Sequence, residues 1–111
     1  MKEMTSETIK FEPQILANLI ENQKNSIVSK VLSKKESGSV TLFAFSAGQG
    51  LSEHTSPFEA LIYLVDGQAE ITIGGTKNSV NANEIIKLPA NIAHAVKAVR
   101  DFKMLLIMIK E

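Results

Sequence analysis

The stretch HTSPFEALIYLVDG, from His54 to Gly67, lies at the centre of the 111-residue chain and decides its fold class. Its second half, ALIYLV (60–65), is rich in β-branched, aromatic and leucine residues, which favours a strand. Side chains alternate across a strand, so both faces of this one are apolar. Ala60, Ile62 and Leu64 share one face, and Leu61, Tyr63 and Val65 share the other.

Similar short runs recur on both sides of this stretch, separated by glycines and polar clusters. Two pairs, Asp66-Gly67 and Gly74-Gly75, predict tight hairpin turns because both can reach the positive φ that such turns need. Residues 34–39 and 81–83 predict further turns, and residues 14–20 after Pro13 predict one short helix. About ten short strands result, which indicates an all-β sandwich or barrel. The clearest strand candidates are 27–32, 40–45, 60–65, 69–73 and 104–109.

The bulk composition excludes several classes of function. Twelve basic residues balance twelve acidic ones, so nothing favours binding to nucleic acid or to an anionic membrane. The chain has no cysteine, which removes disulfides, thiolate zinc sites and cysteine nucleophiles. The longest apolar run, 104–109, is too short for a membrane span, and the first twelve residues contain no apolar signal core. We therefore expect a cytoplasmic protein with neither nucleic-acid nor membrane partners.

Motif spacing adds a family resemblance. Gly48, His54 and Gly67 keep the spacing of the first motif of the cupins, in which a glycine, a His-x-His pair, a glutamate and a second glycine follow in order. The second cupin motif is a glycine, a Pro-x-Gly, a histidine and an asparagine in order. Pro89, Asn91 and His94 stand at its three central positions, with Asn83 at the opening glycine and Ala98 at the closing asparagine. The chain thus resembles a small single-domain cupin. That implies a jelly-roll β-barrel (a double-stranded β-helix) over residues 40–109, an N-terminal arm or helix in residues 1–25, and one domain over 1–111.

The same resemblance draws attention to two substitutions. Cupins that bind metal use two histidines and a glutamate of the first motif with one histidine of the second. Here Ser56 stands at the second histidine position and Ala60 at the glutamate position, so His54 and His94 remain. A divalent Zn, Ni, Mn, Fe or Cu ion is the candidate cofactor, with Glu59 as a candidate third ligand if Pro57 re-aims it.

Two functions remain open on these residues. The first is a cavity that binds a small molecule through His54, Ser56 and His94, with the small Ala60 leaving room. The second is a metal-dependent enzyme, an oxygenase or isomerase, built on the two histidines. The family orientation implies that Ala60, Ile62 and Leu64 face the interior, and that Leu61, Tyr63 and Val65 face outward. We then expect the lining to include Ile62, Leu88, Val96 and either the even or the odd residues of 104–109, and the sequence does not choose between these two sets.

We also expect a homodimer. The outward apolar face of residues 60–65 needs cover, and a net charge of zero does not oppose self-association. The family resemblance implies that residues 7–33 supply the dimer-forming part.

Overall fold

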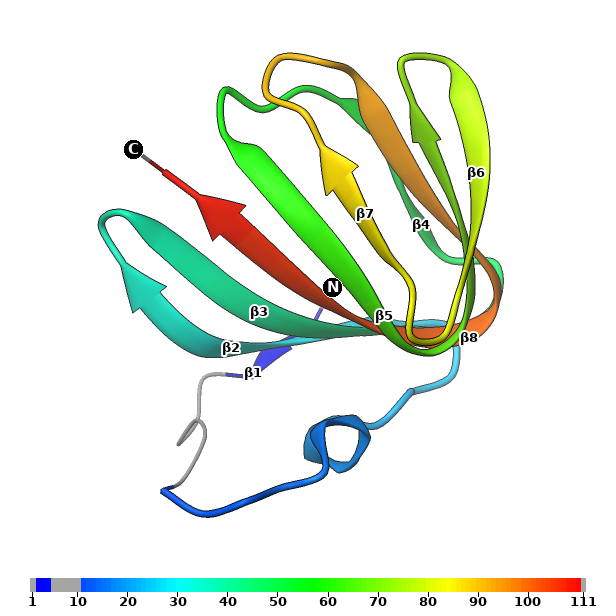
Figure 1. Ribbon diagram of the computed structural model, residues 1–111. Coiled ribbons are helices and arrows are strands. Elements are labelled where there is room, and N and C mark those ends of the chain that lie inside the picture. Colours follow the sequence, from blue (N-terminus) through cyan, green and yellow to red (C-terminus); the bar gives the residue numbers. More distant parts are fainter. Residues whose placement is uncertain (1, 5–10, 111) are drawn as a thin grey trace.

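The computed structural model describes residues 2–4 and 11–110, and strands dominate this part of the chain (Figure 1). Two of its eight strands, β5 and β8, have 15 and 16 residues, so the expected set of uniformly short strands is replaced by fewer, longer ones. No helix in the described ranges is long and apolar enough to cross a membrane. In chain order the elements are β1 (Lys2–Met4), the 3-10 helix η1 (Leu16–Leu19), β2 (Ile27–Lys35), β3 (Gly38–Phe45), β4 (Gly50–His54), β5 (Glu59–Ile73), β6 (Thr76–Asn81), β7 (Ile85–Leu88) and β8 (His94–Ile109).

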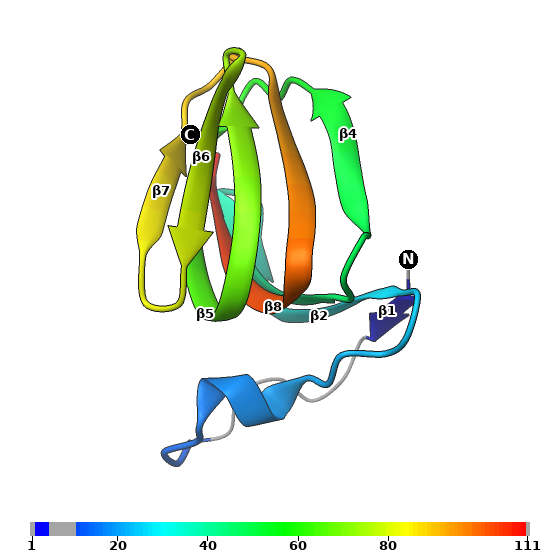
Figure 2. The same ribbon diagram turned by 90° about the vertical axis from the view of Figure 1, so that its right-hand side faces the viewer.

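The long strands β5 and β8 pair with each other in antiparallel fashion and run through two layers. In the first layer, visible in Figure 1, their residues 59–66 and 102–109 lie between β3 and β7, and β2 follows β3. In the second layer, facing the viewer in Figure 2, their residues 69–73 and 94–98 lie between β6 and β4. This is the all-β architecture that the strand pattern predicts, in the jelly-roll form that the family resemblance implies.

The bend between the layers overturns one predicted turn. Asp66-Gly67 is not a hairpin, because β5 continues through it with irregular register on either side. Gly67 has φ +86°, and β8 passes so close that the space for a side chain is taken by the backbone at Phe102. The predicted hairpin at Gly74-Gly75 is confirmed. The two glycines have φ of +55° and +85°, and the residues on either side of them, Ile73 and Thr76, form the last pair of the ladder between β5 and β6.

The main core fills the space between the layers. Ala60, Ile62 and Leu64 are at most 5% exposed, which confirms the predicted inward face of β5. At the bend, the rings of Phe45 and Phe102 stack with their centroids 4.6 Å apart. This core holds the two layers at a fixed separation and so defines the cavity described below.

A smaller core lies under the N-terminal arm. The helix predicted over 14–20 is reduced to the single 3-10 turn η1, which has no side-chain cap and ends in extended backbone at Ile20. Ile20 is 3% exposed and belongs to a buried cluster with Val28 and Leu42 on the outer face of the first layer. The arm is therefore held by packing more than by its own helical hydrogen bonds.

Polar contacts fix the position of the arm. The Asn22 side-chain amide donates to the carbonyl oxygens of Phe45 (2.9 Å) and Phe102 (3.3 Å), the two residues whose rings stack in the main core. The Lys103 ammonium donates to the carbonyl oxygen of Ala17 at 2.7 Å. The arm is thereby tied to the strands that form the bend.

We expect Asn22→Ala to lower the free energy of unfolding by about 1–2 kcal/mol, because it leaves partly buried carbonyl oxygens without their donor. Urea denaturation of both proteins measures the difference. The exposed Asn18, in the same arm, supplies the matched control, and Asn18→Ala should change stability by less than about 0.5 kcal/mol. Equal losses in the two variants would contradict the assigned role of Asn22.

Candidate functional site

A cavity of about 160 Å³ lies between the two layers. Its wall consists of inward side chains from β4, β5, β7 and β8, together with Ser56 and Phe58 from the segment between β4 and β5. The lining residues are Leu51, His54, Ser56, Phe58, Ala60, Ile62, Leu88, His94, Val96, Met104, Leu106 and Met108. All four of the sequence-predicted ligand-binding residues, His54, Ser56, Ala60 and His94, are therefore on this wall.

The two histidines meet at one end of the cavity. His54 is the last residue of β4 and His94 the first of β8, and the two are cross-strand partners. Their Nε2 atoms are 3.1 Å apart, and the rings meet edge to face. His94 is 6% exposed, whereas His54 is open to solvent at the mouth. The barrel thus brings together two side chains that are 40 residues apart in the sequence.

Backbone carbonyls indicate the tautomer of both histidine rings. The Nδ1 atom of His54 is 2.7 Å from the carbonyl oxygen of Ser52, and that of His94 is 3.2 Å from the carbonyl oxygen of Ile92. A carbonyl oxygen only accepts, so each Nδ1 carries its proton, and each Nε2 is bare when its ring is neutral. The 3.1 Å contact is then a hydrogen bond only if a further proton lies between the two Nε2 atoms, which gives the pair a positive charge.

Ser56 and Ala60 have different parts in this wall. The hydroxyl oxygen of Ser56 accepts from the Phe58 N–H at 3.1 Å, as in a turn, and the hydroxyl proton is left to donate elsewhere. Ala60 is 5% exposed and pairs across the sheet with Leu88 and Met108. The position that carries glutamate in metal-binding cupins is thus surrounded by apolar side chains.

Glu59 lies outside the cavity. Its carboxylate is 3.7 Å from the Lys87 ammonium, and it lines a separate surface hollow beside Pro57 and Phe58. Within the described ranges, no three His, Asp or Glu side chains are grouped so that they could hold a metal ion. The cavity therefore offers His54 and His94 as ligands, two where a firm zinc site uses three or four.

Sequence reasoning missed two lining residues and left one choice open. Leu51 shares the inward side of β4, and its signal is its apolar character in an otherwise polar strand. Phe58 follows Pro57, which interrupts the alternation of side chains along the strand. The sequence pattern therefore did not indicate which way the Phe58 side chain points. The even residues of 104–109 line the cavity, because Ala60 pairs with Met108 and thus fixes the register.

The glycine positions of both motifs share a backbone conformation. Gly48 and Gly67 have φ of +87° and +86°, and the asparagines at the two glycine positions of the second motif, Asn83 and Asn91, have φ of +72° and +65°. Asparagine is the residue after glycine that best tolerates this left-handed region. The spacing of the motifs therefore reflects the positions of turns that need positive φ. The chain keeps these turns although it lacks two of the four metal ligands of the family.

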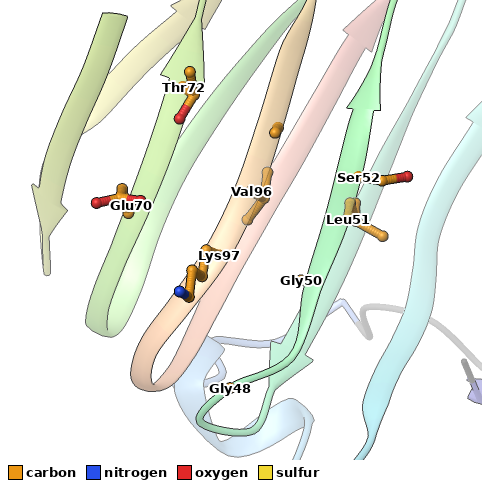
Figure 3. Close-up of a pocket in the computed structure, with 9 residues that line it drawn as sticks. Gly48, Gly50, Leu51, Ser52, Glu70, Thr72, Val96 and Lys97 are labelled. Atoms are coloured by element: carbon orange, nitrogen blue, oxygen red, sulfur yellow. The ribbon is translucent and has the colours of Figure 1, made fainter. Parts of the chain in front are cut away.

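A second hollow lies on the outer side of the second layer, over the row formed by Glu70, Lys97 and Gly50 (Figure 3). At about 370 Å³ it is larger than the barrel cavity, but it is a shallow surface between exposed strands. It includes neither histidine. We therefore place the candidate site in the barrel.

Comparison with known proteins places the chain in a family. Residues 41–110 match the family model described as "Cupin domain". No curated protein matches the sequence.

Several solved structures are similar. A conserved protein of unknown function from Streptococcus pyogenes is 30% identical, with a TM-score of 0.89 over 93% of this chain and 90% of that one. A cupin superfamily protein from Desulfitobacterium hafniense is 29% identical, with a TM-score of 0.88 over 94% and 95% of the two chains. A cupin 2 conserved barrel domain protein from Leptotrichia buccalis is 39% identical, with a TM-score of 0.82 over 85% of this chain and 46% of that one.

Proposed function

The chain belongs to the cupin superfamily, and from this premise we propose that its barrel binds a small organic acid, with the apolar body inside the cavity and the carboxylate at His54 and His94. The observation that carries the proposal is the polarity of the cavity. Its polar side chains are Ser56 and the two histidines, which contact each other, and the rest of its wall is apolar. Small-molecule sites commonly have this form, an apolar pocket with a few convergent polar groups.

The apolar part selects the body of the ligand. Leucine, isoleucine, valine and methionine side chains of four strands supply most of the wall. The unbranched Met104 and Met108 adapt their shape more easily than branched side chains, so they can fit aliphatic or aromatic groups. With about 160 Å³ available, the ligand is of the size of a short fatty acid or a single aromatic ring.

The two histidines select the head group. With both Nδ1 protons donated to backbone carbonyls, a hydrogen bond between the two Nε2 atoms requires one shared proton, and the proposal assigns that positive charge to this end of the cavity. A carboxylate suits such a site, because its negative charge lies close to this positive charge in a largely apolar cavity. The Ser56 hydroxyl, which also lines the cavity, can donate one more hydrogen bond.

Methionine methyl groups provide a direct test. Two of the four methionines, Met104 and Met108, line the cavity, and the other two, Met1 and Met4, are at the start of the sequence. In protein labelled with ¹³C at the methionine methyl groups, titration with hexanoate or benzoate should shift the signals of Met104 and Met108 in a saturable manner. The signals of Met1 and Met4 should stay in place.

Neutral molecules of the same shape serve as matched controls. Hexanamide and benzamide should bind at least about tenfold more weakly, because they lack the charge that pairs with the histidines. Equal affinity for acid and amide would leave an apolar pocket and remove the proposed head group. No shift of Met104 and Met108 with any of the four probes would sink the proposal.

The second candidate is a metal-dependent enzyme of oxygenase or isomerase type that uses His54 and His94. The convergence of two Nε2 atoms favours it, because both can coordinate one ion. Metal analysis of protein purified without a histidine tag separates the two candidates. Stoichiometric Zn, Ni, Mn, Fe or Cu that is lost in His54→Ala or His94→Ala would favour the enzyme, whereas only trace metal, unchanged after incubation with each ion, favours the metal-free binding protein.

A further inference from the structure

The Phe58 side chain borders two spaces at once. It lines the barrel cavity of about 160 Å³, and it also lines a surface hollow of about 460 Å³. We call this second space the side hollow. Its walls are formed by Pro57, Phe58, Glu59, Ala90 and Ile109, and all but Glu59 are apolar. Phe58 is the one residue common to both walls, so apolar surface continues beyond the ring that closes the cavity here.

The Phe58 ring has room to move, whereas its backbone is fixed. Phe58 lies between β4 and β5, and its N–H donates to the Ser56 hydroxyl at 3.1 Å. The Ser56 carbonyl oxygen in turn accepts from the Asn91 N–H at 2.7 Å. The Phe58 side chain is 36% exposed, whereas Ala60 and Ile62 on the same wall are at most 5% exposed. Rotation of this side chain, with the backbone in place, can therefore open the cavity toward the side hollow.

The other hollows that adjoin the cavity are separated from it by paired strands. Leu51 and Val96 line both the cavity and the hollow of Figure 3, but they are cross-strand partners in β4 and β8. Met108 also lines a hollow on the far side of its sheet, and it is paired with Ser39 on one side and Ala60 on the other. Side chains cannot open a sheet without breaking its hydrogen bonds. Phe58 lies outside the strands and is free of this restriction.

The residue after β8 holds the ring in its closing position. The Lys110 ammonium is 5.4 Å from the centroid of the Phe58 ring, within the range of cation–π attraction. The Lys110 N–H donates to the Ser37 carbonyl oxygen at 2.7 Å, so its own backbone is fixed. A cation–π contact near the surface is weak. It therefore favours the closed ring without preventing its displacement.

We propose that Phe58 limits the length of the acid that the barrel binds, and that Lys110 stabilises the closed position of the ring. The inference rests on the proposed function and narrows its ligand class to short acids. Such an acid fits in the cavity with the ring in place. A longer acid must displace the ring and extend its chain over the apolar wall of the side hollow. The cost of displacing the ring falls on the longer acid alone.

Two straight-chain acids of different length test this limit. Titrations followed at the ¹³C-labelled methyl groups of Met104 and Met108 give the affinities for hexanoate and decanoate. Phe58→Ala should raise the ratio of decanoate to hexanoate affinity at least about tenfold over the wild type. Each methylene moved from water to apolar surroundings strengthens binding about fourfold, so burial of part of the longer chain is enough.

Two further variants show which contact is responsible. Lys110→Gln should raise the same ratio by about two- to fivefold, because it removes the cation–π contact and leaves the ring. Phe11→Ala is the matched control, because it removes the same ring from a fully exposed position in the arm, and the ratio should not change. Thermal unfolding checks that all three variants are folded.

The outcomes separate this inference from the proposed function. If the wild type binds hexanoate but Phe58→Ala leaves the ratio unchanged, the length limit is overturned and the proposed function stands. An unchanged ratio in Lys110→Gln would overturn the role of Lys110. The neutral 1-hexanol and 1-decanol cover the opposite case. If acids and alcohols bind equally well, the carboxylate head group is overturned, and a higher ratio of decanol to hexanol affinity in Phe58→Ala still supports the limit. No response to any probe would overturn both.

Discussion

Gly67→Ala should lower the free energy of unfolding by about 3–5 kcal/mol, whereas Gly75→Ala should cost only about 1–2 kcal/mol. The two glycines have nearly the same φ, +86° and +85°, so the backbone penalty for a side chain is the same. They differ in the space that is available for a Cβ atom. A Cβ at Gly67 would overlap the carbonyl oxygen of Asp101 and lie 2.7 Å from the Cα of Phe102, while a Cβ at Gly75 meets nothing within 4 Å.

The difference between these variants isolates the close approach of β5 and β8 at the bend. Urea denaturation of the two variants and of the wild type measures it. Stabilities of small domains are only about 5–15 kcal/mol, so Gly67→Ala is expected to be partly unfolded at moderate temperature. Equal losses at both positions would show that φ alone accounts for the requirement, and the proximity of Phe102 would then have no energetic role.

The same bend explains which features of the fold were predictable. The set of residues on the inward face of β5 and the turn at Gly74-Gly75 follow from local pattern, and both are confirmed. Asp66-Gly67 carries the same local signal, but a glycine with positive φ serves a bulge in a continuous strand as well as a hairpin. The choice depends on β8, which approaches from 35 positions along the chain, at Phe102.

The sequence predicted which residues form the candidate site, but it did not predict the distances between them. Motif spacing correctly placed four residues on one cavity wall, because the turns that set the spacing are retained in this chain. They are His54, Ser56, Ala60 and His94. It gave no indication that the two Nε2 atoms meet at 3.1 Å, since that distance depends on how β4 pairs with β8. Nor did it indicate that Glu59 pairs with Lys87, a partner on another strand.

Removal of either histidine is the prediction with the largest expected effect on binding. We expect His54→Ala and His94→Ala each to weaken hexanoate or benzoate binding at least about tenfold, because the loss of either ring removes the shared proton and its positive charge. The double variant should lose little more than either single variant, because each Nε2 depends on the other to hold the shared proton. Titrations that follow the Met104 and Met108 methyl signals give the affinities.

Two comparisons separate this role from a general effect on the barrel. The neutral amides should lose less than about threefold in the same variants, since they do not use the positive charge. Ser52→Ala should bind as the wild type does, because it retains the carbonyl oxygen that accepts from His54 Nδ1. If acids and amides weaken equally, or if the two single losses add in the double variant, the histidines act only as independent parts of the wall. Carboxylate recognition by a coupled pair, in contrast, requires the losses to be selective for the acid and less than additive.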